Sequence, residues 1–392
     1  MPVQTPIYLD NHSTTKADPR VVDAMLPYFT ENFGNASSRH HEFGWNAEAA
    51  VENARRQIAR LIGAQSNEII FTSGATESIN LALKGIAEAY SSKGNHIVTA
   101  ATEHKAVLDT CKRLERYGFG VTYLPVDRNG FVHPEDVERA ITDRTILVTV
   151  MMANNEIGTI APIAGIGSVC HEAGVLFHTD ATQAVGKIPV NVEDLNVDLM
   201  SFSAHKMYGP KGVGALYIRT MQPRINVVSQ LDGGGHERGF RSGTLNVPAI
   251  VGFGKAAAIA GDEMNLEGER VSSLRDCLEE GILSQTDDIE VNGDRSARLP
   301  HNLNMTFRGI NAERLIMEIK DIAVSTGSAC SSATAEPSHV LRAIGLSDQD
   351  VFSSVRFGLG RFTTQEEIDY TINRVAKSVQ VLRGKAMQFA HS

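Results

Sequence analysis

Two ionisable residues, Lys206 and Asp180, each end a short apolar run of the sequence. Lys206 follows the run 199–202, where its amine could form a Schiff base with an aldehyde cofactor. Taken alone, Lys206 is more simply an exposed lysine, because most lysines are solvated. Asp180 ends the run 175–180, and a carboxylate at the buried end of a strand requires a partner. The pair therefore points to a bound group that both side chains contact.

The group that suits both residues is pyridoxal phosphate (PLP). A PLP site needs a lysine for the Schiff base and an acidic partner for the pyridinium nitrogen. Asp180 by itself could instead be the N-cap of a helix starting at Ala181. Lys206 and Asp180 together favour the PLP site.

A possible phosphate-binding turn lies at 73–77, where small residues join a strand-like run to a helix-like run. Backbone N–H groups at a helix N-terminus bind anions well, and the hydroxyl of Thr76 would add a further donor. The alternative is a capping box without a ligand, because Ser73 followed by Glu77 is ordinary helix-start chemistry.

Three further polar residues follow other strand-like runs. His104 could stack on the cofactor ring and transfer protons. Asn155 and Gln183 could donate hydrogen bonds to the phenolate oxygen of the cofactor. The alternatives are a core or surface histidine and two ordinary turn residues.

Arg356 and Arg361 lie in the largely apolar stretch 355–361. An arginine inside such a run is costly unless it is paired. A carboxylate clamp for an amino-acid substrate would pair it through two hydrogen bonds. The alternative is a salt bridge with an acidic residue of the same protein.

Cys330 is the cysteine with a loop-like context, in a Gly/Ser/Ala-rich segment at 325–336 that we expect to be a mobile loop. Cys111, Cys170 and Cys277 lie in helix-like stretches and are expected to pack as small hydrophobic residues. A loop cysteine reacts as its thiolate. Since Cys330 has no lysine or arginine beside it, His104 is our candidate for its activation. The alternative is an incidental surface cysteine.

Strand-like and helix-like runs alternate up to about residue 261, which predicts an α/β fold with a mostly parallel sheet flanked by helices. Ligands of such sheets bind beyond the carboxyl ends of the strands, where these polar residues are expected. The later sequence predicts a helix at 262–285 and then short strands. We therefore expect a large PLP-binding domain at 16–261. Residues 1–15 and 262–392 would form a smaller α+β domain that carries the Cys330 loop.

The composition narrows the class of protein. The chain has 392 residues and a formal net charge of −9, which disfavours binding to nucleic acids or to membrane surfaces. Its four cysteines show no metal-ligand spacing and no disulfide framework, so we expect no metal site. With no signal-peptide pattern and no apolar stretch of membrane-spanning length, a cytoplasmic protein is expected.

Taken in order, the motifs resemble those of the class I cysteine desulfurases, the NifS/IscS group within aminotransferase class V. The resemblance covers nearly the whole chain, and the order and spacing of its motifs make it specific. The matching segments are 8–11, 14–15, Gly74-Ala75-Thr76-Glu77-Ser78, Thr102-Glu103-His104, 154–158, Asp180-Ala181-Thr182-Gln183, Ser203-Ala204-His205-Lys206, 237–238, 241–244 and Gly327-Ser328-Ala329-Cys330.

This resemblance implies a fold-type I PLP enzyme that acts as a homodimer. Lys206 would carry PLP, and Asp180 would contact its pyridinium nitrogen. Further cofactor-binding positions are Ala75, Thr76, His104, Asn155, Gln183, Ser203, His205 and, reaching into the other subunit, Thr244. Of these, Thr76, Ser203, His205 and Thr244 would hold the phosphate, and Gln183 would contact the phenolate oxygen.

The implied reaction takes sulfur from L-cysteine, with alanine as the product. Asn155 and Arg356 would bind the substrate carboxylate. The catalytic residues would be Lys206, His104 and Cys330, where Cys330 accepts the sulfur as a persulfide. The persulfide would pass to an iron–sulfur scaffold protein or another sulfur acceptor, and Cys330 could transiently ligate a nascent cluster.

Three departures from the family pattern stand out. His236 stands where we expect glutamine, and Gly358 where we expect serine. The chain ends at Ser392, soon after its last predicted helix, which leaves open how a scaffold partner docks.

Other functions remain open at this point. An aminotransferase or a selenocysteine lyase would keep the fold, and transamination would not need Cys330. A non-enzymatic sulfur-trafficking scaffold is a further alternative, which the intact Lys206 and Asp180 disfavour.

Overall fold

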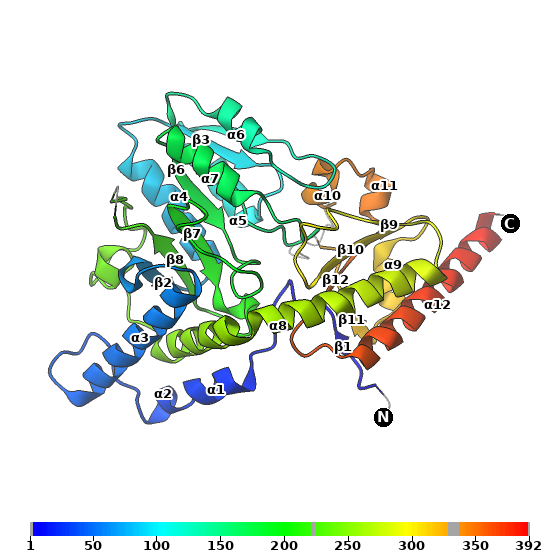
Figure 1. Cartoon of the computed structure of the whole chain (residues 1–392), viewed down its shortest axis with the longest axis horizontal. Coiled ribbons are helices and arrows are strands. Elements are labelled where there is room, and N and C mark those ends of the chain that lie inside the picture. The colour runs from blue at the N-terminus through cyan, green and yellow to red at the C-terminus, as the bar shows by residue number, and fades with distance from the viewer. Residues whose placement is uncertain (1–2, 222–223, 328–336, 391–392) are drawn as a thin grey trace.

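A computed structural model of the chain describes residues 3–221, 224–327 and 337–390 (Figure 1). Its main feature is a seven-stranded sheet. In spatial order the strands are β2 (Ile69–Thr72), β8 (Gly214–Ile218), β7 (Leu199–Ser203), β6 (Leu176–Asp180), β5 (Thr145–Thr149), β3 (His96–Ala100) and β4 (Gly120–Leu124). Strand β8 runs antiparallel to β2 and β7, whereas the pairs from β7 to β4 are parallel. The prediction of a mostly parallel sheet is confirmed.

Helices cover both faces of this sheet, which explains why its strands are apolar on both sides. Neighbouring residues alternate between two cores: Leu147 belongs to one and Val148 to the other. One core is closed by α4 (Ala75–Ala89) and α5 (Lys105–Glu115), and the other by α3 (Glu42–Leu61), α7 (Ile163–Glu172) and the start of α8 (Val247–Gln285). The remaining helices of this part are α1 (Pro19–Met25), α2 (Pro27–Thr30) and α6 (Pro134–Ala140).

Helix α8 crosses the molecule and joins its two parts (Figure 1). We expected a helix only from residue 262, but α8 begins at Val247. Its first part contains glycines because it packs closely against α3: a Cβ on Gly254 would lie 2.5 Å from the Cα of Ala54. The proposed domain boundary at 261 therefore falls within a continuous helix.

The second part is built on an antiparallel sheet ordered β12 (Ser354–Gly358), β10 (Asn302–Phe307) and β9 (Ile289–Val291). A two-stranded parallel pair joins β1 (Ile7–Tyr8) to β11 (Ile322–Ala323). Their core includes the N-terminal Ile7 and the later half of α8. The helices of this part are α9 (Ala312–Glu318), α10 (His339–Ala343), α11 (Asp348–Val351) and α12 (Gln365–Ala390).

Among the described residues, no helix combines the length and the apolar character needed to cross a membrane. The same residues contain no cluster of three or more His, Cys, Asp or Glu side chains arranged to hold a metal ion.

Candidate active site

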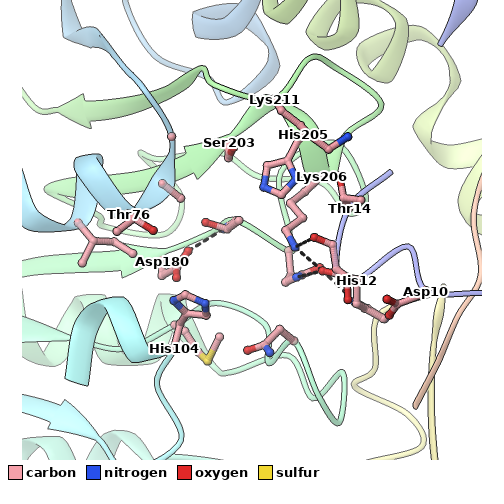
Figure 2. Close-up of a pocket in the computed structure, with 18 of the residues that line it drawn as sticks. Asp10, His12, Thr14, Thr76, His104, Asp180, Ser203, His205, Lys206 and Lys211 are labelled. Atoms are coloured by element: carbon pink, nitrogen blue, oxygen red, sulfur yellow. Dashed lines mark hydrogen bonds between the residues drawn. The ribbon is translucent and has the colours of Figure 1, made fainter. Parts of the chain in front are cut away.

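A cavity of about 860 Å³ opens at the carboxyl ends of β5, β6 and β7 (Figure 2). Its walls include most of the residues that the sequence singled out: Ala75, Thr76, His104, Asn155, Asp180, Gln183, Ser203, His205, Lys206 and Arg356. Thr244 is exposed and is not among the residues that line the cavity in this chain. Cys330 lies outside the described residues.

Lys206 stands at the end of a 3₁₀ turn, 204–206, directly after β7. Its Nζ donates hydrogen bonds to the backbone carbonyls of His12 and Ser13, the latter at 2.7 Å. Burial, together with the positive charge of Arg356, lowers the pKa of Lys206 to about 8, while Asp10 and Asp180 oppose this shift. An amine with such a pKa is partly neutral near pH 7, and the neutral form is the nucleophile that an aldehyde requires.

Asp180 is the last residue of β6 and is almost fully buried. Its Oδ1 accepts a hydrogen bond from the backbone N–H of Thr182 at 2.9 Å. The N-cap alternative is wrong, because residues 181–185 form turns instead of a helix. The hydroxyl of Thr182, which also lines the cavity, is buried without a partner among the described residues.

The start of α4 lines one end of the cavity, where the sequence predicted a phosphate-binding turn. Gly74 precedes it with φ +155°, and the space beside its Cα is open. Glu77 accepts from the backbone N–H of Ser73 at 2.7 Å and pairs with Arg241 at 2.8 Å, but the N-cap is Gly74 and no side chain caps it, so the capping-box alternative is wrong. The exposed Thr76 remains available to a ligand.

Two basic residues face the same end of the cavity (Figure 2). His205 Nδ1 lies 3.1 Å from the hydroxyl of Thr14. Burial, together with the charges of Lys206 and Lys211, lowers the pKa of His205 to about 4. His205 is therefore neutral at pH 7, and Lys211 supplies a positive charge that our sequence analysis missed.

His12 is a second residue that the sequence analysis missed. Its Nδ1 lies 3.1 Å from Gln183 Oε1, and its Nε2 lies 3.0 Å from Asn302 Nδ2. Because the Asn302 amide nitrogen can only donate, the proton of His12 belongs on Nδ1, which donates to Gln183. Burial holds the pKa of His12 well below its usual range, so the ring stays neutral. His12 lies between the matching segments 8–11 and 14–15, and this was the available signal.

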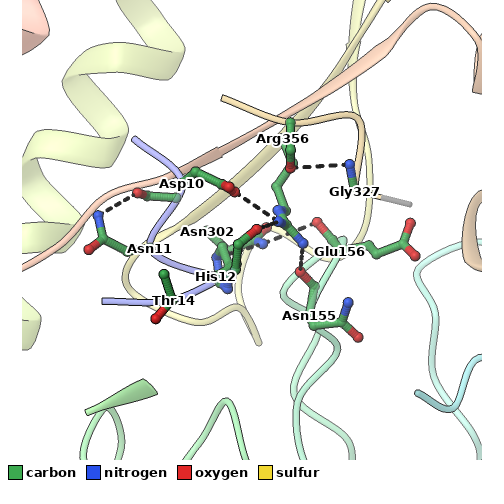
Figure 3. A network of polar contacts seen from close by, with 12 residues as sticks. Asp10, Asn11, His12, Thr14, Asn155, Glu156, Asn302, Gly327 and Arg356 are labelled. Carbon is green, nitrogen blue, oxygen red and sulfur yellow. Dashed lines mark hydrogen bonds and ion pairs between the residues drawn. The ribbon is translucent and has the colours of Figure 1, made fainter. Parts of the chain in front are cut away.

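Arg356 projects from β12 toward the cavity and is already paired within the protein (Figure 3). It donates to the carbonyl of Asn155 at 2.7 Å and to Asp10 Oδ1 at 2.9 Å. Its Nε is buried with no partner among the described residues. Arg356 therefore forms the salt bridge that was the alternative interpretation, with Asp10, and it also borders the cavity. Arg361 instead pairs with Glu267 and does not line the cavity.

His104 caps α5 and accepts the backbone N–H of Ala106 on its Nδ1 at 3.1 Å. Although its side chain is open to the cavity, desolvation by the surrounding protein lowers its pKa. Asp180 opposes this shift, and Lys206 adds to it. The neutral ring therefore carries its proton on Nε2, where it can act as an acid toward a ligand.

The three described cysteines lie away from the cavity. Cys111 and Cys170 are buried, and burial raises the pKa of each thiol to about 12. Cys277 is half-buried beside Gln365, with its Sγ 3.4 Å from the amide nitrogen of that residue. None of these three lines the cavity.

Comparison with known proteins places these features in one family. A family model described as aminotransferase class-V matches residues 7–371. The cysteine desulfurase IscS of Anaeromyxobacter sp. (strain Fw109-5) is 58% identical over 381 residues, which cover 97% of this chain and 94% of that protein. A solved NifS-like protein has a TM-score of 0.90 at 38% identity and covers 96% of this chain and 100% of its own. The structure of SspA in complex with cysteine has a TM-score of 0.81 at 37% identity, over 91% of this chain and 100% of the other.

The chain belongs to the aminotransferase class-V family of PLP-dependent enzymes. Within that family it is a cysteine desulfurase, and the predictions of fold, cofactor and activity made from the sequence are confirmed. The cavity fits PLP, because it joins a nucleophilic lysine, a buried aspartate and an open helix N-terminus.

Proposed function

We propose that the cavity binds PLP on Lys206 and takes sulfur from L-cysteine onto Cys330. The observation that carries this proposal is the convergence, in one cavity, of Lys206 with a lowered pKa, the buried Asp180 and the N-terminus of α4. Bound PLP supplies an electron sink for the α-carbon of an attached amino acid. The residues of the chain supply everything else.

The cofactor would be held at three points. Asp180 would pair with the ring nitrogen, and its Oδ2 has no protein partner among the described residues. Ala75, Thr76, Ser203 and His205 would hold the phosphate, and Lys211 would add a compensating charge. Gln183 keeps one amide hydrogen for the phenolate oxygen, since the other is donated to the carbonyl of His12 at 3.1 Å.

The substrate carboxylate would bind at Arg356 and Asn155. Arg356 lines the cavity, and its Nε, although buried in this conformation, has no partner among the described residues. The amide side chain of Asn155 lines the same wall (Figure 3). A carboxylate here would compete with Asp10 for the guanidinium, so substrate binding would exchange one ion pair for another.

Proton transfer would be divided between two residues. The neutral amine of Lys206 would accept the α-proton of the substrate. His104, neutral with its proton on Nε2, could donate its Nε2 proton and later accept another.

Sulfur transfer would be a displacement at the substrate sulfur. The Cys330 thiolate forms the new S–S bond, the Cβ–S bond breaks, and its electron pair stays with the carbon, which gains protons and becomes alanine. The product on the enzyme is a persulfide, so no external oxidant is required.

The enzyme would act as a homodimer. Large apolar side chains from α1 to the start of α3 are each 51–63% exposed, which is unusual for a monomer surface: Leu26, Phe29, Phe33, Phe43 and Trp45. A second copy of the chain would cover them. Thr244 would then reach the phosphate in the partner subunit, which agrees with its exposed position here.

The sulfur acceptor is proposed to be an iron–sulfur scaffold protein or another thio-cofactor carrier in the cytoplasm. A pull-down of persulfide-accepting proteins with the sulfur-loaded enzyme would identify it. Whether Cys330 also ligates a nascent cluster is tested by iron binding to the same complex.

Replacing Cys330 with alanine tests the central proposal. The C330A enzyme should keep the visible absorbance of bound PLP and respond spectrally to L-cysteine, yet form neither persulfide nor stoichiometric alanine. C277A, which changes the half-buried cysteine outside the cavity, is the matched control and should behave as wild type. Sustained alanine production by C330A would refute the assigned role.

A further inference from the structure

Glu156 is a buried carboxylate, 3% exposed, for which the proposed mechanism has no use. It follows Asn155 in the turn 154–157 that leads away from β5. Its Oε2 accepts a hydrogen bond from the hydroxyl of Ser338. The same oxygen closely approaches Gly327, since a Cβ built there would lie 3.0 Å away. One carboxylate thus hydrogen-bonds to Ser338 and lies so close to Gly327 that a side chain there would crowd it, although both residues are distant in the sequence.

Gly327 and Ser338 are placed on either side of the segment that contains Cys330. Gly327 has φ +86°, a backbone conformation that favours glycine, and its N–H donates to the hydroxyl of Ser325. Ser338 is the N-cap of α10 and accepts the N–H of Leu341 at 3.1 Å. The Glu156 carboxylate therefore links the described residues at both ends of this segment.

The position of Glu156 is itself fixed by the small sheet (Figure 3). Its carbonyl accepts from the side-chain amides of Asn302 at 3.1 Å and Asn304 at 3.2 Å, both on β10. Its N–H donates to Asn154 Oδ1 at 2.8 Å. Asn304 is held in turn by Asn292 at 2.7 Å. Such a buried and connected set of hydrogen bonds holds the backbone of Glu156 in one place, and its side chain then starts from a fixed point.

The same turn also contacts the proposed substrate site. The carbonyl of Asn155 accepts from Arg356 at 2.7 Å. The backbone of Arg356 exchanges hydrogen bonds with Ser325, which lies two residues before Gly327. The residues that would bind the substrate carboxylate and those that flank the Cys330 segment therefore share one rigid framework.

We propose that Glu156 is a positioning residue that sets where Cys330 meets the substrate sulfur, by holding Gly327 and Ser338 against the turn that carries Asn155. The inference rests on the proposed function of Cys330. In this proposal Glu156 does not itself contact the atoms that react. Its contribution is a hydrogen bond and a packing contact, so an uncharged side chain of the same shape should serve.

The test separates persulfide formation from substrate binding in the holoenzyme. A single turnover with L-cysteine, followed by mass spectrometry of Cys330, gives the rate of persulfide formation, and a spectral titration gives the Kd for L-cysteine. In Glu156→Ala we expect the rate to fall about 10-fold or more and the Kd to change less than about 3-fold, because small misplacements of a reacting group are costly in rate. Glu156→Gln should stay within about 3-fold of wild type in both measurements.

Ser338→Ala provides a second test that does not depend on the buried glutamate being replaceable. It removes the hydroxyl that binds Glu156 and the cap of α10. Ser347→Ala is the matched control, because Ser347 caps the neighbouring α11 by accepting from Asp350 and has no bond to Glu156. Persulfide formation should slow in Ser338→Ala and remain unchanged in Ser347→Ala.

Several outcomes would overturn the inference. Wild-type persulfide formation in Glu156→Ala would do so, as would a Kd that weakens in proportion to the rate. Equal behaviour of the two serine variants would also contradict it. If Glu156→Ala does not fold, the comparison of Ser338→Ala with Ser347→Ala tests the inference instead. A failure of the proposed function is distinguishable, since wild-type enzyme itself would then carry no persulfide on Cys330.

Discussion

The two walls of the cavity are built differently. The wall from the large sheet presents reactive atoms: the amine of Lys206, the free oxygen of Asp180 and the open N-terminus of α4. The wall from the small sheet uses its polar atoms mainly on other parts of the protein. Arg356, for example, contacts Asn155, Asp10 and Ser13.

This difference suggests a division of labour between chemistry and position. Reactive groups stand at the ends of parallel strands, where packing on both faces of the sheet keeps them rigid. Hydrogen bonds of the small sheet hold the N-terminal segment and the turn 154–157 at the cavity. Substitutions in the first wall should therefore remove the chemistry, and substitutions in the second should change binding and geometry.

Breaking the first wall should have the largest effect. Lys206→Ala removes both the attachment point of PLP and the proposed base, so kcat/KM for alanine formation should fall at least about 1,000-fold. Steady-state alanine assays would measure it. Lys112→Ala, an exposed lysine on α5, is the control and should be unaffected. A kcat/KM within 10-fold of wild type would contradict the assignment of the chemistry to the first wall, because a 10-fold change corresponds to only about 1.4 kcal/mol of activation free energy.

Breaking the second wall should weaken binding more than it slows the chemistry. Arg356→Met removes the proposed carboxylate clamp, so KM for L-cysteine should rise about 100-fold while kcat falls less than about 10-fold. Initial-rate kinetics separate the two terms. The exposed Arg314→Met serves as control. A decrease in kcat with an unchanged KM would assign Arg356 to the chemical step, and the two walls would then not differ in role.

The two walls should also be coupled electrostatically. The pKa of Lys206 is about 8, and the charge of Arg356 contributes to lowering it from the usual value. Covalent capture of PLP by apoenzyme needs the neutral amine, so its rate should fall about 10-fold for each pH unit well below 8. Removing a nearby cation raises the pKa of an amine, so Arg356→Met should shift the midpoint of this profile to higher pH.

Absorbance at a series of pH values, with the same PLP solution for both proteins, measures this shift. Because the titration of PLP itself is common to both proteins, the difference between their midpoints reports on the protein. An unchanged or lower midpoint in Arg356→Met would show that the two walls are electrostatically independent.

The smallest effect is expected from a substitution where the two parts of the molecule meet, and it should change only the stability of the fold. Lys187 is buried 3.5 Å from Glu267 of α8, and burial lowers its pKa to about 7. The unfolded chain keeps this lysine protonated up to about pH 10.4, so between pH 7 and 10.4 the unfolded state binds more protons. The free energy of unfolding should then rise with pH across this range, by a few kcal/mol at most since each pKa unit is about 1.4 kcal/mol.

Lys187→Met should lose this rise, which urea unfolding at pH 7 and pH 9.5 would reveal. Exposed Lys112→Met is the control and should retain the wild-type pH dependence. A rise that persists in Lys187→Met would place its origin in other groups.

The sequence by itself determined the local features of this protein. Apolar runs of the right length predicted the strands, and their ends correctly marked Asp180, Lys206 and most of the residues around the cavity. This succeeds because the side chains of a strand report directly on the faces that it buries, and because the carboxyl ends of parallel strands meet at one edge.

Only the tertiary structure decided which residues pair with one another through hydrogen bonds and ion pairs. Nothing near Arg356 in the sequence indicates its pairing with Asp10, and nothing near Glu156 indicates Ser338. The same holds for His12, whose contacts with Gln183 and Asn302 join segments far apart in the chain. Such contacts depend on how the two sheets pack around α8, and hydrogen bonds between distant segments form only once that packing brings their atoms within about 3 Å.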